Sequence, residues 1–113
     1  MTETIFHIAR RSDWRLAQKA GEYRADSLVS EGFIHCSTIE QVLRVANDLY
    51  ASRHGLVLLS IDTAKLISPV KWEIPPTCAE SFPHIYGPIN LEAVIKAPAF
   101  EPDPDGKWRQ IPS

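Results

Sequence analysis

Hydrophobic and polar residues repeat with two periods along the chain, one typical of strands and the other of helices. A two-residue alternation runs through residues 4–9 and again through residues 70–74, as in strands that bury one face. Residues 56–61 form a continuous apolar run, which is typical of a strand buried on both faces. We expect further strands at residues 32–37 and 91–97, and an irregular, aromatic-rich segment at residues 81–88.

Two segments carry the signals that start a helix. Ser12 is placed to cap a short helix that ends by Gly21. Ser37 and Glu40 fit a capping box, and apolar residues at helical spacing extend this second helix to about Ser52. Because few elements are long enough for a doubly wound fold, the sequence predicts the α+β class, with a curved, mostly antiparallel (split) sheet and two main helices.

The composition changes only towards the C-terminus. From Pro98 onward the chain holds four of its nine prolines and an Asp-Gly turn signal. We therefore predict a single α+β domain over residues 1–97 and a Pro-rich C-terminal arm over residues 98–113. Trp108 and Ile111 indicate that part of the arm packs on the domain, although a loosely docked terminus is the favoured interpretation.

Composition and charge narrow the class of protein. With 113 residues, 44% of them hydrophobic and 23% charged, the chain has the size and apolar content of one globular domain. A net charge of -2 and a pI of about 6.0 argue against a dedicated nucleic-acid binder or a polybasic membrane module. Two cysteines are too few for a disulfide scaffold. Without a signal-peptide-like or membrane-spanning apolar run, we expect a soluble cytoplasmic protein.

The predicted strand at residues 32–37 carries the first candidate site residues. Alternation places Ile34 and Cys36 on one face and Phe33, His35 and Ser37 on the other. We expect the face of Ile34 and Cys36 to pack in the core. His35 and Ser37 would then lie beside a helix N-terminus, which attracts anions. If Ser37 caps that helix, its hydroxyl is less free to touch a ligand. The structural alternative, a His35 ring bonded to a neighbouring loop, stays open.

Four more residues have chemistry that a ligand site uses. His7 interrupts an apolar strand, where a partly buried side chain with one satisfied partner is the structural alternative. Glu73 lies on the polar face of its strand, and a carboxylate there binds ribose hydroxyls or acts as a base, unless it is merely solvated. His84 transfers protons and Tyr86 offers a stacking ring, in a segment that a rigid structural loop would explain equally well. His54, at a helix end, fits a surface residue.

Metal and cysteine chemistry are poorly supported. His35 and Cys36 point to opposite faces of one strand, and Cys78 and His84 belong to no metal-binding motif. Cys78 has no evident base beside it, which disfavours a Cys–His nucleophile. The chain also lacks the G-x-G-x-x-G, P-loop and G-x-S-x-G motifs. We therefore predict no bound metal.

Two sequence strings resemble the signatures of a known family. Residues 31–37, Glu-Gly-Phe-Ile-His-Cys-Ser, and residues 82–87, Phe-Pro-His-Ile-Tyr-Gly, look like those of the DUF952 family of small bacterial proteins without established activity. The resemblance extends from Ile5 to about Val94.

A more distant resemblance suggests a function. Residues 6–9, Phe-His-Ile-Ala, and residues 34–37, Ile-His-Cys-Ser, stand where RNA 2′-phosphotransferases carry Tyr-His-Gly-Thr and Val-His-Leu-Ser. Their ADP-ribosyltransferase-like fold implies a split antiparallel sheet around an NAD cleft. By this resemblance His7 contacts the nicotinamide ribose, His35 and Ser37 line the cleft, and Glu73 binds the ribose 2′-hydroxyl.

The chain also departs from that pattern. Isoleucine and alanine replace the Gly-Thr that follows the first histidine, and the late arginine of the phosphotransferases is not evident near Glu73. The N-terminal RNA-binding half of those enzymes has no counterpart, so tRNA processing and nucleic-acid binding are not expected.

The leading hypothesis is an ADP-ribosyltransferase-like domain with NAD as cofactor and a small-molecule or nucleotide ligand as partner. His35, Glu73 and His84 would be catalytic. His7, His35, Ser37 and Tyr86 would bind the cofactor. The alternatives are a catalytically inactive module that binds a metabolite or a protein, and a small hydrolase or transferase in which His35 or His84 is the general base.

Overall fold

Two long strands form the centre of the main sheet. The computed structural model describes residues 3–112, in which β1 (Thr4–Arg10) pairs antiparallel with β4 (Leu56–Asp62). The other edge of β4 pairs with β8 (Val94–Lys96) and β9 (Ala99–Phe100). Because β4 has strands on both edges and packed side chains on both faces, its apolar run is continuous, as the sequence predicted.

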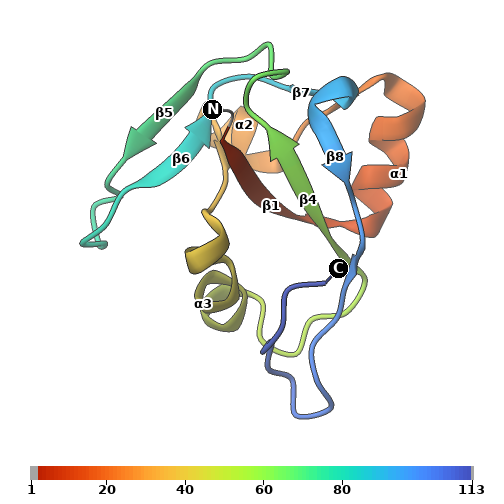
Figure 1. Ribbon diagram of the computed structural model, residues 1–113, viewed down its shortest axis with the longest axis vertical. Coiled ribbons are helices and arrows are strands. Elements are labelled where there is room, and N and C mark those ends of the chain that lie inside the picture. The colour runs from red at the N-terminus through yellow and green to blue at the C-terminus, as the bar shows by residue number, and fades with distance from the viewer. Residues whose placement is uncertain (1–2, 113) are drawn as a thin grey trace.

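A second sheet lies beside the main sheet and has the order β3-β6-β5 (Figure 1). It consists of β3 (Ile34–His35), β5 (Val70–Glu73) and β6 (Phe82–Ile85), all antiparallel. The expectation of an irregular segment at residues 81–88 was wrong for β6. The strand accommodates Pro83 because its carbonyl still accepts a hydrogen bond from the Cys36 N–H, at 3.1 Å. Proline has no N–H to donate to Cys36, and the pairing of β6 with β3 ends at this position.

Within residues 3–112, one isolated residue pair bridges the two sheets. Phe6 in β1 and Ser37, just after β3, exchange two backbone hydrogen bonds of 2.8 Å each. This bridge holds the start of the main sheet against the end of β3 and gives the split antiparallel arrangement. A short pair of strands, β2 (Glu22–Tyr23) and β7 (Ile89–Asn90), completes the pairing, and the 3-10 helix η1 (Leu91–Ala93) takes the first part of the strand expected at residues 91–97.

The longer helices are α1 (Arg11–Ala20) and α3 (Ile39–Leu49), with the five-residue α2 (Asp26–Ser30) between them. The prediction that Ser12 caps the first helix was wrong. Helix α1 begins directly after β1, so its N-cap is Arg10 and Ser12 lies inside the helix. Helix α3 also differs from expectation, because its N-cap is Thr38 and its capping box uses Gln41. The box is shifted by one residue because the backbone of Ser37 is already paired with Phe6. Among residues 3–112, no helix has the length and apolar content that crossing a bilayer needs.

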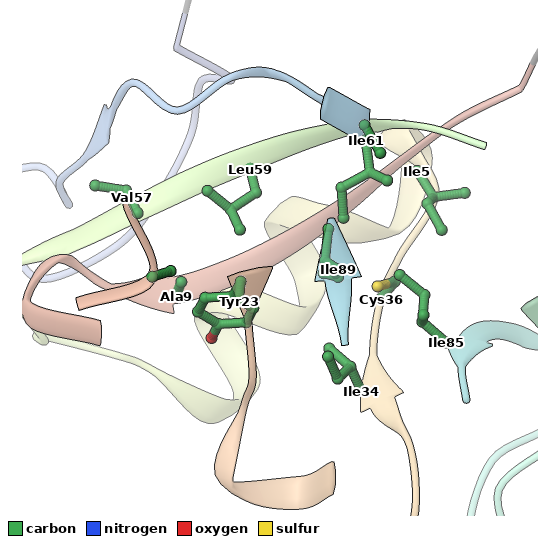
Figure 2. Packing of buried hydrophobic residues seen from close by; sticks show 12 residues of the cluster. Ile5, Ala9, Tyr23, Ile34, Cys36, Val57, Leu59, Ile61, Ile85 and Ile89 are labelled. Carbon is green, nitrogen blue, oxygen red and sulfur yellow. The ribbon is translucent and has the colours of Figure 1, made fainter. Parts of the chain in front are cut away.

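The main core lies between the two sheets and α1. Side chains from β1, β3, β4 and β6 meet there, with Ile34, Cys36 and Ile85 together at one end and Ala9, Tyr23 and Val57 towards the other (Figure 2). Ile34 and Cys36 therefore face the core, as alternation predicted. It follows that the other face of β3 is directed away from this core.

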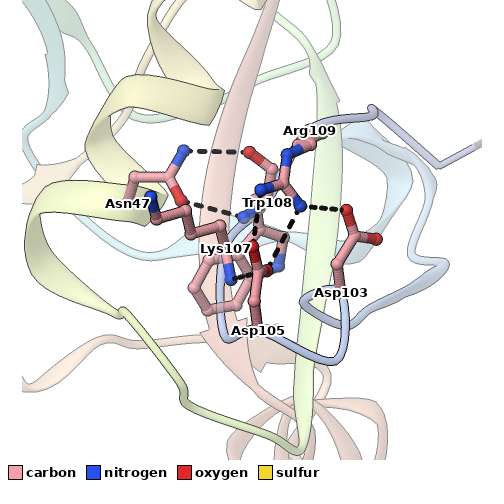
Figure 3. A network of polar contacts seen from close by, with 6 residues as sticks. All are labelled: Asn47, Asp103, Asp105, Lys107, Trp108 and Arg109. Atoms are coloured by element: carbon pink, nitrogen blue, oxygen red, sulfur yellow. Dashed lines mark hydrogen bonds and ion pairs between the residues drawn. The ribbon is translucent and has the colours of Figure 1, made fainter.

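A second core cluster secures the C-terminal segment. Phe100 and Trp108 are 1% and 2% exposed and pack with Val42 and Ala46 of α3. The side chain of Asn47 holds the same segment by two hydrogen bonds to the Trp108 backbone, of 2.8 and 2.9 Å (Figure 3). The Pro-rich segment is therefore packed against the sheet and α3 through residues with low exposure.

Candidate active site

One face of the second sheet gathers the residues that the sequence singled out. His35 of β3 stands opposite His84 of β6, and Lys71 of β5 stands opposite His84 on the other side. The Cys36 N–H bonds the Pro83 carbonyl, so His35 and His84 form the pair type in which side chains approach closely. Alternation adds other residues to this histidine face, which consists of Phe33, His35, Ser37, Lys71, Glu73, Phe82, His84 and Tyr86.

A carboxylate orients the ring of His84. Glu73 Oε1 lies 2.7 Å from His84 Nδ1 and 2.6 Å from the hydroxyl of Tyr86. The Tyr86 hydrogen bond, followed by that of His84, lowers the pKa of Glu73, and the same contact with Glu73 raises the pKa of Tyr86. An ionised carboxylate can only accept hydrogen bonds. The proton of the neutral His84 ring is therefore on Nδ1, and Nε2 carries a lone pair.

The second nitrogen of His84 is buried without a partner. The His84 side chain is 4% exposed, and its Nε2 has no hydrogen-bond partner among residues 3–112. Phe33 stacks on the ring, with centroids 4.1 Å apart and planes 14° from parallel, and His35 meets it edge-on at 5.3 Å. Leaving a buried polar atom unpaired costs about 1–3 kcal/mol, and a catalytic role is one explanation for such an atom in a native structure.

His35 is more exposed than His84. Its Nε2 lies 2.9 Å from Glu31, and both side chains are about half exposed. An exposed pair of this kind contributes little to stability. The contact with Glu31 therefore does little to fix the position of the His35 ring.

His7 is fully engaged inside the protein. Its Nδ1 donates to the His35 carbonyl at 2.6 Å, and its Nε2 accepts the Tyr23 hydroxyl at 2.9 Å. Burial lowers the pKa of His7 to about 4, so the ring is neutral at pH 7. Both ring nitrogens are used by these contacts, and the His7 ring supports the backbone of His35.

A groove of about 1060 Å³ connects these residues. His7, His35, Ser37 and His84 all contribute to its wall, together with α3 and residues 75–80. Glu73 and Tyr86 do not line the groove and act on it through His84. The structure thus brings the three predicted histidines to one groove, although they are far apart in sequence.

The charged side chains around the groove are largely paired within the protein. Arg10 bonds Asp13 and Asp26 at 2.9 Å each, and Arg44 pairs with Glu80. Among residues 3–112, no group of three or more His, Cys, Asp or Glu side chains is arranged to hold a metal ion. The groove wall carries the imidazoles of His7, His35 and His84, hydroxyl groups that include those of Ser27 and Ser37, and the exposed thiol of Cys78.

Three residues that contact the site histidines were not predicted as site residues from the sequence. Tyr23, the partner of His7, lies in a two-residue strand that left no periodic signal. Glu31, the partner of His35, precedes the strand in a turn. Phe33 had a signal, because alternation placed it on the face of His35, and a stacking role follows from that position.

The comparison with family models identifies the chain. The model described as "Protein of unknown function (DUF952)" matches residues 8–97. The chain belongs to the DUF952 family. This confirms the resemblance noted from residues 31–37 and 82–87, which contribute β3 and β6 to the histidine face. No curated protein matches this DUF952 member.

Solved structures share the fold over nearly the whole chain. The crystal structure of protein CC0527 from Caulobacter crescentus is 30% identical, with 92% of this chain and 91% of that chain covered and a TM-score of 0.82. The solution NMR structure of CC0527 is likewise 30% identical, covers 92% and 90%, and has a TM-score of 0.79. The α+β architecture of this DUF952 protein is therefore shared with an experimentally determined structure.

Proposed function

We propose that this DUF952 protein is a small-molecule hydrolase or transferase in which His84 is the general base. The observation that carries the proposal is His84, which lines the groove and whose buried Nε2 has no hydrogen-bond partner among residues 3–112, while Nδ1 is fixed by Glu73. A histidine whose one nitrogen is bonded to a carboxylate and whose other nitrogen is free is arranged to accept a proton.

The chemistry follows from the arrangement of the three groups. Nε2 accepts a proton from a hydroxyl or a water in the groove, and the imidazolium that forms lies 2.7 Å from the Glu73 carboxylate. The Tyr86 hydrogen bond, by lowering the pKa of Glu73, keeps that carboxylate ionised so that it stabilises the positive ring. Glu73 is thus the positioning residue and His84 the catalytic residue. His35, at the exposed side of His84, contacts the ligand.

An NAD or ADP-ribosyl ligand is the second candidate. Support comes from His7, His35 and Ser37, which line one groove as the resemblance to the RNA 2′-phosphotransferases implies. A volume of about 1060 Å³ is also at the upper end of small-molecule sites. It ranks second because both nitrogens of His7 and the accepting oxygen of Glu73 are already bonded within the protein.

The test is a turnover screen with matched variants. Aryl esters, aryl phosphates and NAD are offered to the wild-type protein, to His84→Gln and to Glu73→Gln, with His54→Gln as the control for an exposed histidine. We expect turnover of one class that falls at least about 100-fold in His84→Gln, the scale of general-base catalysis. Turnover that is equal in wild type and His84→Gln would contradict the proposal.

Binding without turnover would favour a third interpretation. An NMR titration of the labelled protein with NAD, ADP-ribose and nicotinamide, run beside the screen, reports binding at His35 and His84. Localised shifts with no turnover would indicate an inactive module that binds a metabolite.

A further inference from the structure

We propose that Ser37 is the nucleophile of this site, and that its substrate is a carboxylic ester or thioester. The inference rests on the proposed function, because it needs His84 as the base. It adds a covalent acyl-enzyme step and a substrate class to that function.

The hydroxyl of Ser37 is released by the way α3 begins. Thr38 is the N-cap of α3, and its N–H donates to Gln41 at 3.0 Å, so the helix does not use Ser37 for capping. The hydrogen bonds that Ser37 makes run through its backbone, to Phe6. Ser37 lines the groove and is 7% exposed. Ser37 is therefore held at the groove wall by its backbone, and its hydroxyl is not used to cap α3.

The register of the sheet places Ser37 and His84 as diagonal neighbours. His35 stands opposite His84, and Ser37 follows His35 by two residues on the same face. Diagonal residues on adjacent strands lie about 7–8 Å apart. His84 Nε2 has no partner among residues 3–112, so proton transfer requires the Ser37 hydroxyl and the His84 ring to approach each other when the substrate binds. The Cys36 hydrogen bond to Pro83 keeps the two segments side by side up to this point. Ser37, His84 and Glu73 thus stand in the order of a nucleophile, a base and a residue that orients the base.

Helix α3 supplies the charge stabilisation that an acyl transfer needs. It begins two residues after Ser37 and runs for 11 residues. The first N–H groups of a helix have no partner within the helix and carry partial positive charge. In α3 the Gln41 N–H is taken by Thr38, and the N–H groups before it, of Ile39 and Glu40, lie next to the proposed nucleophile, where the substrate carbonyl oxygen becomes negative.

The reaction balances in two half-steps. First, Ser37 Oγ loses its proton to His84 Nε2 and bonds the carbonyl carbon; the bond to the leaving group then breaks, and the leaving alkoxide or thiolate takes the proton from Nε2. Second, water loses a proton to Nε2 and its oxygen bonds the acyl carbon; the Ser37 ester bond breaks and Oγ takes the proton back. The products are a carboxylic acid and an alcohol or thiol.

The test is covalent labelling with a fluorophosphonate, which needs no knowledge of the natural substrate. Such a probe forms an Oγ–P bond with an activated serine and releases fluoride. Ser27 provides the matched control, because it lines the same groove but its hydroxyl already donates to the Phe33 carbonyl at 2.7 Å. Labelling is measured by intact mass and located by peptide mapping in wild type, Ser37→Ala, Ser27→Ala and His84→Gln, each checked for folding by circular dichroism.

We expect one adduct on Ser37, which is lost in Ser37→Ala, retained in Ser27→Ala and formed at least about 100-fold more slowly in His84→Gln. Absence of an adduct, or an adduct on another residue, would overturn the assignment of Ser37. If ester turnover still depended on His84 in that case, the proposed function would stand with water as the direct nucleophile. An adduct on Ser37 that forms equally fast in His84→Gln would overturn both proposals.

Discussion

The pH dependence of stability tests the assignment of His7 as an internal support. Burial lowers the pKa of His7 to about 4 in the folded protein, from an ordinary value of 6.5. Between these two values the unfolded chain binds more protons at this site than the folded chain. Stability is therefore fully present above pH 6.5, and it is lost progressively as the pH falls towards 4.

The expected size of the effect follows from the two pKa values. Linkage gives a loss of about 2 kcal/mol at pH 5 and about 3 kcal/mol at pH 4, relative to pH 7. Solvent screening does not reduce this contribution to the unfolding free energy, because His7 is only 7% exposed. Other groups also titrate in this range, so the quantity to measure is the difference between wild type and a variant without the titrating ring.

The assay is urea unfolding, followed by tryptophan fluorescence at pH 7, 6, 5 and 4. His7→Gln keeps a donor and an acceptor at this position but does not titrate, and its unfolding free energy should fall by about 3 kcal/mol less than that of wild type between pH 7 and pH 4. His54→Gln, at an exposed histidine, should follow the wild-type curve. If wild type and His7→Gln lose equal stability over this range, the His7 ring does not have the low pKa on which this reasoning depends.

Three further predictions concern other parts of the molecule. Tyr86→Phe removes the main cause of the lowered pKa of Glu73, so a carboxyl ¹³C titration should show that pKa rising; an unchanged midpoint would contradict the hydrogen bond. Phe100→Ala should cost about 3–5 kcal/mol in urea unfolding, and a loss below about 1 kcal/mol would mean that the C-terminal segment is not part of the core. Iodoacetamide should modify exposed Cys78 in the native protein and spare Cys36, whose thiol pKa is raised by burial; equal rates would contradict that burial.

The long strands and the face of β3 were predictable, because periodicity reports burial directly. A strand buried on both faces, such as β4, needs a continuous apolar run. A strand buried on one face needs the alternation that places Ile34 and Cys36 opposite His35. Strand β6 was not predictable in this way, because a proline such as Pro83 normally argues against a strand. Only the tertiary structure shows that the pairing with β3 ends at Pro83.

The candidate site was predictable in its members but not in their arrangement. Sequence alone picked His35, His84 and Glu73 from separate segments, but cross-strand register decides that they meet. The N-cap of α3 shows the same limit. Ser37 and Thr38 are both good caps, and only the tertiary bridge to Phe6 determines that Thr38 is used and that the Ser37 hydroxyl is left for the groove.

The most direct test of the central claim is long-range ¹H–¹⁵N NMR of the His84 ring, which shows which nitrogen carries the proton. We expect the neutral ring to carry its proton on Nδ1, bonded to Glu73, and Nε2 to be unprotonated and available as a base. A neutral ring with its proton on Nε2 would contradict the account, because that nitrogen could not accept a proton from a substrate.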